Sequence, residues 1–218
     1  MSEYGEQSGL TWIRSIMENR TRSFLGRYTK TAVMVPLVMT ELNELAVLFE
    51  ERAHTLRRQP GEISFPGGHF EPADTSESAT AIRETSEELG IPESSIELLG
   101  PLDVFAAYSG LLVFPYVGLL LDYPHLHPNC SEVNAVFAVE LSRLLASQPE
   151  VYRVPLRPNP PDDFPYHRIP NGRDYAWRTM ESETWFYEFD GRIIWGLTAR
   201  ILSHFLEVVH SGRGSLRE

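Results

Sequence analysis

The sequence predicts a single α/β domain in which helices pack on both faces of a mixed β-sheet. Short apolar runs typical of strands are interspersed with single segments of helical spacing, and no internal repeat is present. No low-complexity linker divides the chain, and 218 residues with 42% apolar content suffice for one sizeable core. We expect an N-terminal helical extension over residues 1–30, one domain over 31–210 and a frayed C-terminus over 211–218.

The first part of the chain is expected to form a helix followed by two strands. Apolar residues recur at helical spacing between Leu10 and Asn19, which favours a short amphipathic helix. Two apolar runs, at 31–39 and 45–49, are separated by a polar turn and are typical of strands. Because Pro36 has no backbone N–H to donate, it favours an edge position or a bulge for the first strand.

A second helix is predicted over about residues 76–89. The segment 74–77 offers an N-cap residue followed three positions later by an acidic residue, and Gly90 followed by Pro92 ends the helix. A stripe of small and apolar residues recurs at helical spacing and is expected to face the core. This stripe consists of Ala79, Ile82, Ser86 and Leu89.

The remaining segments continue the alternation of strands and helices. We expect strands at 111–122, 135–140 and 185–189, a short helix at 141–146 and a closing helix at 195–209. Six prolines fall within residues 155–170, and this density excludes regular structure. We therefore expect an ordered surface loop or flap in that segment.

The charge balance of the chain excludes one large class of partners. With 19 basic and 30 acidic residues, the formal net charge is −11. A nucleic-acid polymer requires basic side chains to neutralise its phosphates, so we expect no such partner. A smaller phosphate substrate would need a bound cation or a few locally clustered arginines, and the sequence contains candidates for both.

Three features bear on the location of the protein. The single cysteine, Cys130, cannot form an intrachain disulfide, and the first residues are acidic and polar, unlike a secretory signal. The longest apolar run, residues 111–121, contains Pro115 and is shorter than the roughly 20 residues of a membrane-spanning helix. We expect a cytoplasmic protein with no membrane partner.

The acidic face of the helix predicted at 76–89 carries the most information about chemistry. Glu77, Glu84 and Glu88 stack along one strip, Glu87 lies beside them, and all four are expected to point away from the core. Like charges four residues apart cost an isolated helix about 0.2–0.5 kcal/mol, so a compensating group is expected. Hard carboxylate oxygens suit Mg²⁺ or Mn²⁺, although the same charges also occur on ordinary solvated helix faces.

A glycine pair just upstream of the helix favours a metal site over an ordinary solvated helix face. The segment 64–68 reads Ser-Phe-Pro-Gly-Gly, and two glycines allow backbone groups to approach a ligand that a Cβ would exclude. A close backbone loop that leads into an acidic helix indicates a site for a metal-bridged phosphate.

Residues Gly68 to Ile91 resemble the Nudix box. That pattern begins with Gly, five residues of any type, Glu and seven residues of any type. It ends with Arg-Glu, an apolar residue, one residue of any type, Glu-Glu, one residue of any type, Gly and an apolar residue. The match from Arg83 onward is almost complete, with Thr85 in the apolar place. The segment from Gly68 to Arg83 is one residue longer than the pattern and lacks the first glutamate. The residue that would substitute for this glutamate is Asp74, Glu71 or Glu77.

The longer box is similar to that of the Nudix subgroup that hydrolyses coenzyme A. This subgroup has a second signature, Leu-Leu-Thr, one residue, Arg, Ser or Ala, three residues, Arg, three residues, Gly, three residues and Phe-Pro-Gly-Gly. The chain has Leu48, Arg52-Ala53, Arg57, Gly61 and Phe65-Pro66-Gly67-Gly68 at these intervals. Only Phe49 and Glu50 depart from the signature.

The resemblance implies a Nudix-type α/β/α sandwich and a role for each matching residue. Glu84, Glu88, Glu87 and the carbonyl of Gly68 would hold Mg²⁺ or Mn²⁺, and one of the glutamates, not identified by the sequence, would act as general base. Arg83 would orient a neighbouring glutamate or contact the substrate. The expected catalytic residues are Glu84, Glu87, Glu88 and Arg83.

The resemblance also implies the substrate and the residues that bind it. Arg52 and Arg57, with Arg58 adjacent, would bind the 3′-phosphate or the diphosphate of coenzyme A, unless they form a solvated loop, and Gly67 would approach the ligand. The implied products are 4′-phosphopantetheine and adenosine 3′,5′-bisphosphate. Two alternatives remain, namely hydrolysis of another nucleoside diphosphate compound and a non-catalytic nucleotide sensor. The sequence leaves the oligomeric state open, with a homodimer among the options.

Overall fold

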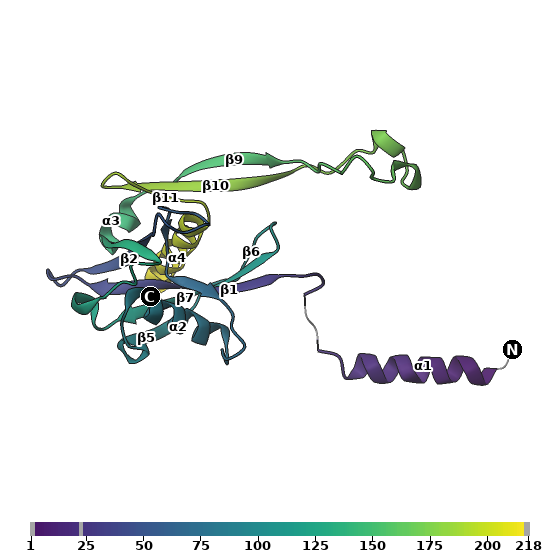
Figure 1. Cartoon of the computed structure of the whole chain (residues 1–218), viewed down its shortest axis with the longest axis horizontal. Helices are drawn as coiled ribbons and strands as arrows, with labels where there is room; N and C mark the ends of the chain where they lie inside the picture. The colour runs from purple at the N-terminus through teal and green to yellow at the C-terminus, as the bar shows by residue number, and fades with distance from the viewer. Residues whose placement is uncertain (1–2, 22–23, 216–218) are drawn as a thin grey trace.

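The computed structural model describes residues 3–21 and 24–215. The helices are α1 (Glu3–Glu18), α2 (Glu77–Leu89), α3 (Leu141–Ala146) and α4 (Gly196–Ser215). The strands are β1 (Thr29–Met39), β2 (Leu45–Arg52), β3 (Ile63–Ser64), β4 (Gly67–His69), β5 (Ile96–Pro101), β6 (Phe105–Ala106), β7 (Leu111–Leu120), β8 (Val133–Glu140), β9 (Glu150–Leu156), β10 (Met180–Phe189) and β11 (Arg192–Trp195). The predicted α/β class is confirmed, because α2 and α4 pack on opposite faces of one sheet (Figure 1).

The main sheet is mixed, as predicted. Its strand order is β3–β2–β1–β7–β5, with β4 also paired to β1, β6 to β7 and β8 to β2. Strands β1 and β7 run parallel, whereas the other pairs are antiparallel. Strands β9, β10 and β11 form a second, antiparallel sheet.

The expectation that Pro36 marks an edge strand or a bulge is wrong. Strand β1 lies in the middle of the sheet, and Pro36 is opposite Gly118 in the regular ladder with β7. On its other side β1 pairs with β4 only up to Val33 and with β2 only from Leu37 onward. The N–H of Met34 points to that side and donates to the Pro66 carbonyl at 2.9 Å. The nitrogen of Pro36, two residues further on, faces the same side, where no ladder partner requires a donor.

Apolar clusters fill the space on both faces of the main sheet. Because successive side chains of a strand point to opposite faces, Val35 and Val47 pack on the side of α4, whereas Met34 and Leu48 pack on the side of α2. The α4 side also includes residues of α3 and of the smaller sheet. The main sheet therefore lies between two layers. Residues of β1, α2 and the first turns of α4 line one cavity as a result.

The inner face of α2 differs from the predicted stripe. Leu89 is buried as expected, but the other buried residues are Thr80, Ala81, Thr85 and Glu88, while Ala79, Ile82 and Ser86 are half-buried. The helix lies against the glycine pair of β4, where the Gly67 N–H donates to Glu88, so Glu88 turns inward. Thr85 is buried with its hydroxyl donating to the Ala81 carbonyl of the same helix at 2.6 Å. The predicted limits of the helix, in contrast, agree with α2 to within one residue.

Two segments extend from the body of the molecule (Figure 1). Helix α1 confirms the expected N-terminal helix and begins earlier, at Glu3. Strands β9 and β10 form a hairpin whose tip contains short 3₁₀ turns at Tyr166–Arg168 and Gly172–Asp174. The expectation that 155–170 lacks regular structure is wrong for Pro155 and Leu156, which end β9 and pair with β10. Helix α4 continues to Ser215, past residue 210, while residues 1–2, 22–23 and 216–218 of the expected extensions lie outside the described residues.

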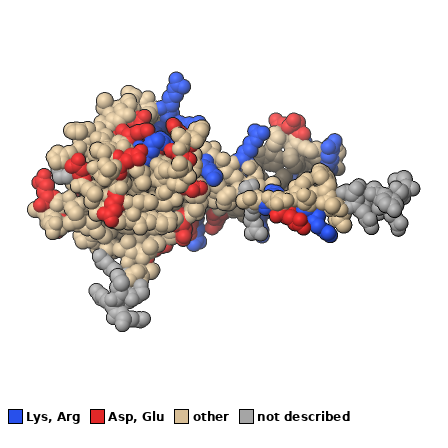
Figure 2. All heavy atoms as spheres, turned by 90° about the horizontal axis from the view of Figure 1, so that it is seen from below, with Lys and Arg blue, Asp and Glu red and all other residues tan. Residues whose placement is uncertain are grey.

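Two surface properties bear on partners. No helix in the described ranges is long and apolar enough to cross a membrane. On the face shown in Figure 2, the described Lys and Arg side chains are scattered among Asp and Glu and form no continuous basic patch.

Candidate active site

The turn that joins β3 to β4 brings backbone atoms unusually close to α2 and β1. A Cβ on Gly67 would overlap the Ala32 carbonyl and lie 2.6 Å from the Cα of Val33. A Cβ on Gly68 would overlap the carboxylate of Glu84 instead. The two glycines therefore have different roles. Gly67 allows the turn to contact the backbone of β1, and Gly68 allows it to contact the Glu84 side chain of α2.

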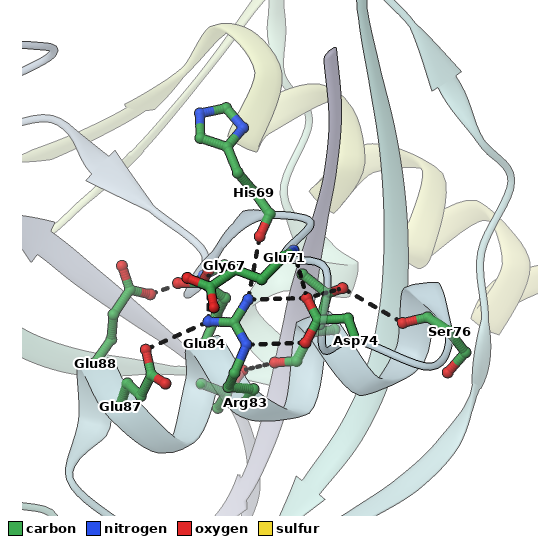
Figure 3. A network of polar contacts seen from close by, with 12 residues as sticks. Gly67, His69, Glu71, Asp74, Ser76, Arg83, Glu84, Glu87 and Glu88 are labelled. Carbon is green, nitrogen blue, oxygen red and sulfur yellow. Dashed lines mark hydrogen bonds and ion pairs between the residues drawn. The ribbon is translucent and has the colours of Figure 1, made fainter. Parts of the chain in front are cut away.

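Arg83 lies at the centre of a polar network between α2 and the chain that precedes it (Figure 3). Its Nε and Nη2 donate to the two carboxylate oxygens of Asp74, both at 3.0 Å, and Nη2 also donates to the His69 carbonyl at 3.1 Å. Its Nη1 lies 3.0 Å from Oε1 of Glu84 and 3.4 Å from Oε2 of Glu87. Arg83 thus fixes the position of Glu84, which agrees with the orienting role considered for it.

Asp74 is the acidic residue outside α2 that pairs with Arg83. It also accepts hydrogen bonds from the Thr80 hydroxyl at 2.8 Å and from the backbone N–H of Glu71 at 2.9 Å. The Arg83 guanidinium holds the pKa of this carboxyl well below its usual range. Glu77, in contrast, pairs with Lys30, whose Nζ lies 3.7 Å from Oε1 of Glu77. Of the three residues considered as substitutes for the missing box glutamate, Asp74 is therefore the one that contacts Arg83.

The glutamates of α2 do not share one outward face. Glu88 is only 5% exposed, and its Oε2 accepts a hydrogen bond from the Gly67 N–H at 2.8 Å. The Glu84 side chain is 16% exposed, whereas that of Glu87 is 58% exposed. The expectation that all four acidic side chains point away from the core is therefore wrong for Glu88, because the glycine turn offers it a buried backbone donor.

A second buried carboxylate, Glu50 of β2, lies near Glu88. Its Oε1 accepts a hydrogen bond from the Ser64 hydroxyl at 2.9 Å. Burial raises the pKa of Glu88 above the ordinary carboxyl range, and the charge of Glu50 raises it further. Burial likewise raises the pKa of Glu50, and Glu132 adds to both shifts. This corner of the protein therefore concentrates negative charge where little water can screen it.

The loop before β8 brings Glu132 to this corner. The N–H of His127 donates to the Leu89 carbonyl at 3.0 Å, and the N–H of Asn129 donates to the Glu88 carbonyl at 2.9 Å, so the loop closes the end of α2. The N–H of Ala53 donates to the Glu132 carbonyl at 2.7 Å. These bonds hold Glu132 between α2 and the end of β2.

These elements enclose an open cavity of about 520 Å³. Its lining combines the glycine turn, the acidic helix, the end of β2 and the first turns of α4. The lining includes Arg52, Ser64, Gly67, Gly68, Glu84, Glu88, Glu132, Leu197, Thr198 and Ile201. The Thr198 hydroxyl donates to the Ile63 carbonyl at 3.1 Å and joins α4 to β3 beside the cavity.

The structure brings together some of the expected site residues and leaves others apart. Glu84, Glu88, Gly67, Gly68 and Arg52 line the same cavity. Arg57 and Arg58 are exposed on the loop after β2, outside this lining, and Glu87 is outside it as well. Their predicted roles in binding substrate or metal therefore stay predictions.

Several residues of the site were not selected from the sequence. Glu50 gave one signal, since it is a charged residue at the end of an otherwise apolar run and departs from the expected signature. Ser64 and Thr198 were not selected as site residues, because their contacts are with residues distant in the sequence. Glu132 was not selected either, and contacts of the loop before β8 bring it to the site.

The donors present are of the type that a hard divalent cation prefers. Glu84, Glu88 and Glu132 supply carboxylate oxygens to the cavity, the Gly68 carbonyl is adjacent, and a buried oxygen of Glu50 has no partner among the described residues. No three His, Cys, Asp or Glu side chains in the described part of the chain form a preassembled metal site. The donor set thus fits Mg²⁺ or Mn²⁺ in its chemistry.

The chain is similar to several known proteins. A family model described as the NUDIX domain matches residues 28–150. "Uncharacterized Nudix hydrolase NudL" of Photorhabdus laumondii is 34% identical over 178 residues, which are 82% of this chain and 83% of that protein. Mouse "peroxisomal coenzyme A diphosphatase NUDT7" is 39% identical over 123 residues, which are 56% of this chain and 51% of that protein. A crystal structure of a Nudix hydrolase from M. smegmatis, RenU, is 22% identical, with 58% and 78% of the two chains covered and a TM-score of 0.45.

Proposed function

The chain belongs to the Nudix hydrolase family, and from this premise we propose that it hydrolyses the diphosphate of coenzyme A or its derivatives with the help of Mg²⁺ or Mn²⁺. The expected products are 4′-phosphopantetheine and adenosine 3′,5′-bisphosphate. Water attacks one phosphorus of the P–O–P bridge, and the bridging oxygen leaves with the other phosphate.

One observation supports this substrate above others. The coenzyme A signature and the Nudix box meet only at the glycine turn, yet Arg52 of the first and Glu84 and Glu88 of the second line one cavity. The glycine turn shared by the two stretches lies between them. A basic residue on one wall and carboxylates on the other are suited to a phosphorylated nucleotide whose diphosphate is held by a cation.

The mouse relative supports the same substrate class. Its printed name specifies a coenzyme A diphosphatase, and the match covers 56% of this chain. The match also covers only 51% of that protein, so the substrate is a proposal that a direct assay must test.

The residues of the site have distinct tasks in this reaction. A divalent cation, when bound, neutralises charge on the diphosphate oxygens and increases the electrophilicity of phosphorus. Glu84 and Glu88 and the Gly68 carbonyl would hold it, with Glu87 as a further candidate. Arg83 keeps Glu84 in place, and the Gly67 N–H orients Glu88. Arg52 would pair with a phosphate of the substrate.

The test is incubation of the purified protein with coenzyme A and Mg²⁺ or Mn²⁺, with chromatographic separation of the products. We expect adenosine 3′,5′-bisphosphate only with metal, and a strong reduction in the Glu88→Gln variant. Glu97→Gln, on the exposed edge strand β5, is a matched control that should behave as wild type. Intact coenzyme A together with cleavage of other nucleoside diphosphate compounds would reject this substrate. Binding without any turnover would instead favour a nucleotide sensor.

A second arm of the assay tests which phosphate Arg52 contacts. Arg52→Gln should raise KM for coenzyme A more than for dephospho-coenzyme A if Arg52 binds the 3′-phosphate. Equal effects on both substrates would indicate contact with the diphosphate. Arg14→Gln, on the exposed helix α1, serves as the control for a change of charge alone.

A further inference from the structure

Glu50 contains a buried charged atom that the fold itself does not satisfy. The residue is 1% exposed, and only its Oε1 has a hydrogen-bond partner, the Ser64 hydroxyl at 2.9 Å. Its Oε2 is buried and has no partner in the described part of the chain. A buried carboxylate oxygen without a donor carries a large desolvation cost, so a natural protein usually supplies a donor or a cation.

The strand geometry directs this carboxylate toward α2. Along β2, Leu48 packs on the α2 side of the sheet and Phe49 on the α4 side. Side chains alternate, so Glu50 lies on the same side of the sheet as Leu48, which is the side covered by α2. Glu88 of α2 is close enough for its charge to interact with that of Glu50.

The carboxylates around Glu50 require positive charge beyond what the neighbouring side chains supply, either as protons or as a bound cation. The groups that act on it are the Ser64 hydroxyl, the Arg52 guanidinium and the carboxylates of Glu88 and Glu132. Arg52 is the single cation in this group, and its Nε is also buried, with no hydrogen-bond partner among the residues that the structure describes. Three carboxylates and one guanidinium leave negative charge in a region of low dielectric.

We propose that Glu50 is an additional ligand of the divalent cation held at Glu84 and Glu88, and that it binds this cation through Oε2. The inference rests on the cation dependence of the proposed function. The expected signature has Thr at this position, and a threonine would bring neither the negative charge nor the unpartnered oxygen. Glu87, which the Nudix box suggested as a ligand, is exposed and bound to Arg83, whereas Glu50 is buried beside Glu88.

The test is Mn²⁺ binding, measured in the absence of substrate by calorimetry and by the electron paramagnetic resonance signal of free Mn²⁺. Glu50→Gln preserves the shape of the side chain and an acceptor for Ser64 but removes the charge. We expect Mn²⁺ affinity to fall by at least about tenfold. The melting temperature of the metal-free protein should be unchanged or higher, because an unpaired buried charge is removed.

Glu51→Gln is the matched control, because Glu51 is the adjacent residue on the same strand and contacts His54 and Asn134 instead. It should bind Mn²⁺ as wild type does. Glu50→Asp is the second variant, which keeps the charge but withdraws the oxygens, and it should show an intermediate affinity. Unchanged Mn²⁺ affinity in both Glu50 variants would overturn the proposal. So would a lower melting temperature of metal-free Glu50→Gln combined with a normal Mn²⁺-induced shift, since that result describes a purely structural carboxylate.

The binding assay separates this inference from the proposed substrate. If the wild type binds Mn²⁺ through Glu50 but leaves coenzyme A intact, the ligand assignment stands and the substrate is wrong. If coenzyme A is cleaved and Glu50→Gln binds Mn²⁺ normally, the substrate stands and the ligand assignment is wrong.

Discussion

The carboxylate of Glu84 occupies the space that a side chain on Gly68 would fill. Gly68 does not adopt a left-handed backbone conformation, so no backbone strain requires a glycine at this position. The requirement comes from Glu84, which is drawn against the β4 backbone while Arg83 holds it from the other side at 3.0 Å. The close packing of Gly68 and Glu84 thus sets the distance between the acidic helix and the glycine turn.

Gly68→Ala should therefore reduce activity far more than stability. The new methyl group would displace the end of a flexible side chain, which costs little in folding but moves a proposed metal ligand. We expect kcat to fall by about 10²-fold, since misplacement of a reactive group by about 1 Å has this effect. Gly100→Ala is the control, because a Cβ there meets nothing within 4 Å. A wild-type kcat for Gly68→Ala would mean that the position of Glu84 does not matter.

Gly67→Ala should have the opposite profile. Its φ of 155° is unfavourable for other residues, and a Cβ would meet the backbone of β1, which cannot move aside. We expect the free energy of unfolding to fall by about 1–3 kcal/mol, as for other overpacked sites. Urea denaturation of Gly67→Ala and Gly68→Ala side by side measures this difference, and equal stability of the two variants would contradict it.

The sequence predicted the elements whose signals are local. Helix α2 begins after Ser76, whose hydroxyl accepts from the Ala79 N–H at 3.1 Å, and ends at Gly90, so both limits depend on residues within the segment. The inward rotation of Glu88 was not predictable in this way, because its donor belongs to Gly67 in another element. Likewise, the pairing of Glu50 with Val136 between β2 and β8 joins segments far apart in the chain. Helical periodicity alone therefore placed Glu88 on the wrong face.

Asp74→Asn should weaken the protein at neutral pH and reduce its sensitivity to acid. Arg83 lowers the pKa of Asp74 in the folded state, so the folded form binds a proton less readily than the unfolded form. The resulting stabilisation is fully present above the unfolded pKa of about 3.9 and is lost gradually as pH falls from that value toward the much lower pKa of the folded state. The difference in melting temperature between wild type and Asp74→Asn should therefore be largest near pH 7 and become smaller as pH is lowered from 4 to 2. A difference that stays constant over this range would show that the charge of Asp74 contributes nothing.

Activity provides a second measurement on Asp74→Asn. The asparagine keeps one acceptor for Arg83 but loses the charged, two-point contact, so Glu84 should be held less firmly. We expect a reduction of about 10-fold to 100-fold in apparent Mn²⁺ affinity or activity, typical of residues that orient a metal ligand. Asp122→Asn, on a surface loop and paired only with His125 in the contacts described, is a suitable control.

Glu88→Gln should affect the stability of the metal-free protein and the activity of the metal-loaded protein in opposite directions. Burial and the charge of Glu50 raise the pKa of Glu88, so in metal-free protein the folded state binds its proton more tightly than the unfolded state does. This group therefore stabilises the fold most below the ordinary carboxyl pKa of about 4.3, and the stabilisation declines as pH rises above that value. In the presence of a chelator, wild-type stability should fall between pH 5 and pH 9, and Glu88→Gln should flatten this decline. The glutamine can still accept a hydrogen bond from the Gly67 N–H, so the variant should be at least as stable as wild type at pH 8.

With Mn²⁺ and substrate present, Glu88→Gln should be less active than wild type. We expect activity to fall by about 10²-fold to 10⁴-fold, whether Glu88 holds the cation or acts as the base. A metal-free Glu88→Gln protein that is less stable than wild type at pH 8 would show that the buried carboxylate is satisfied without a cation.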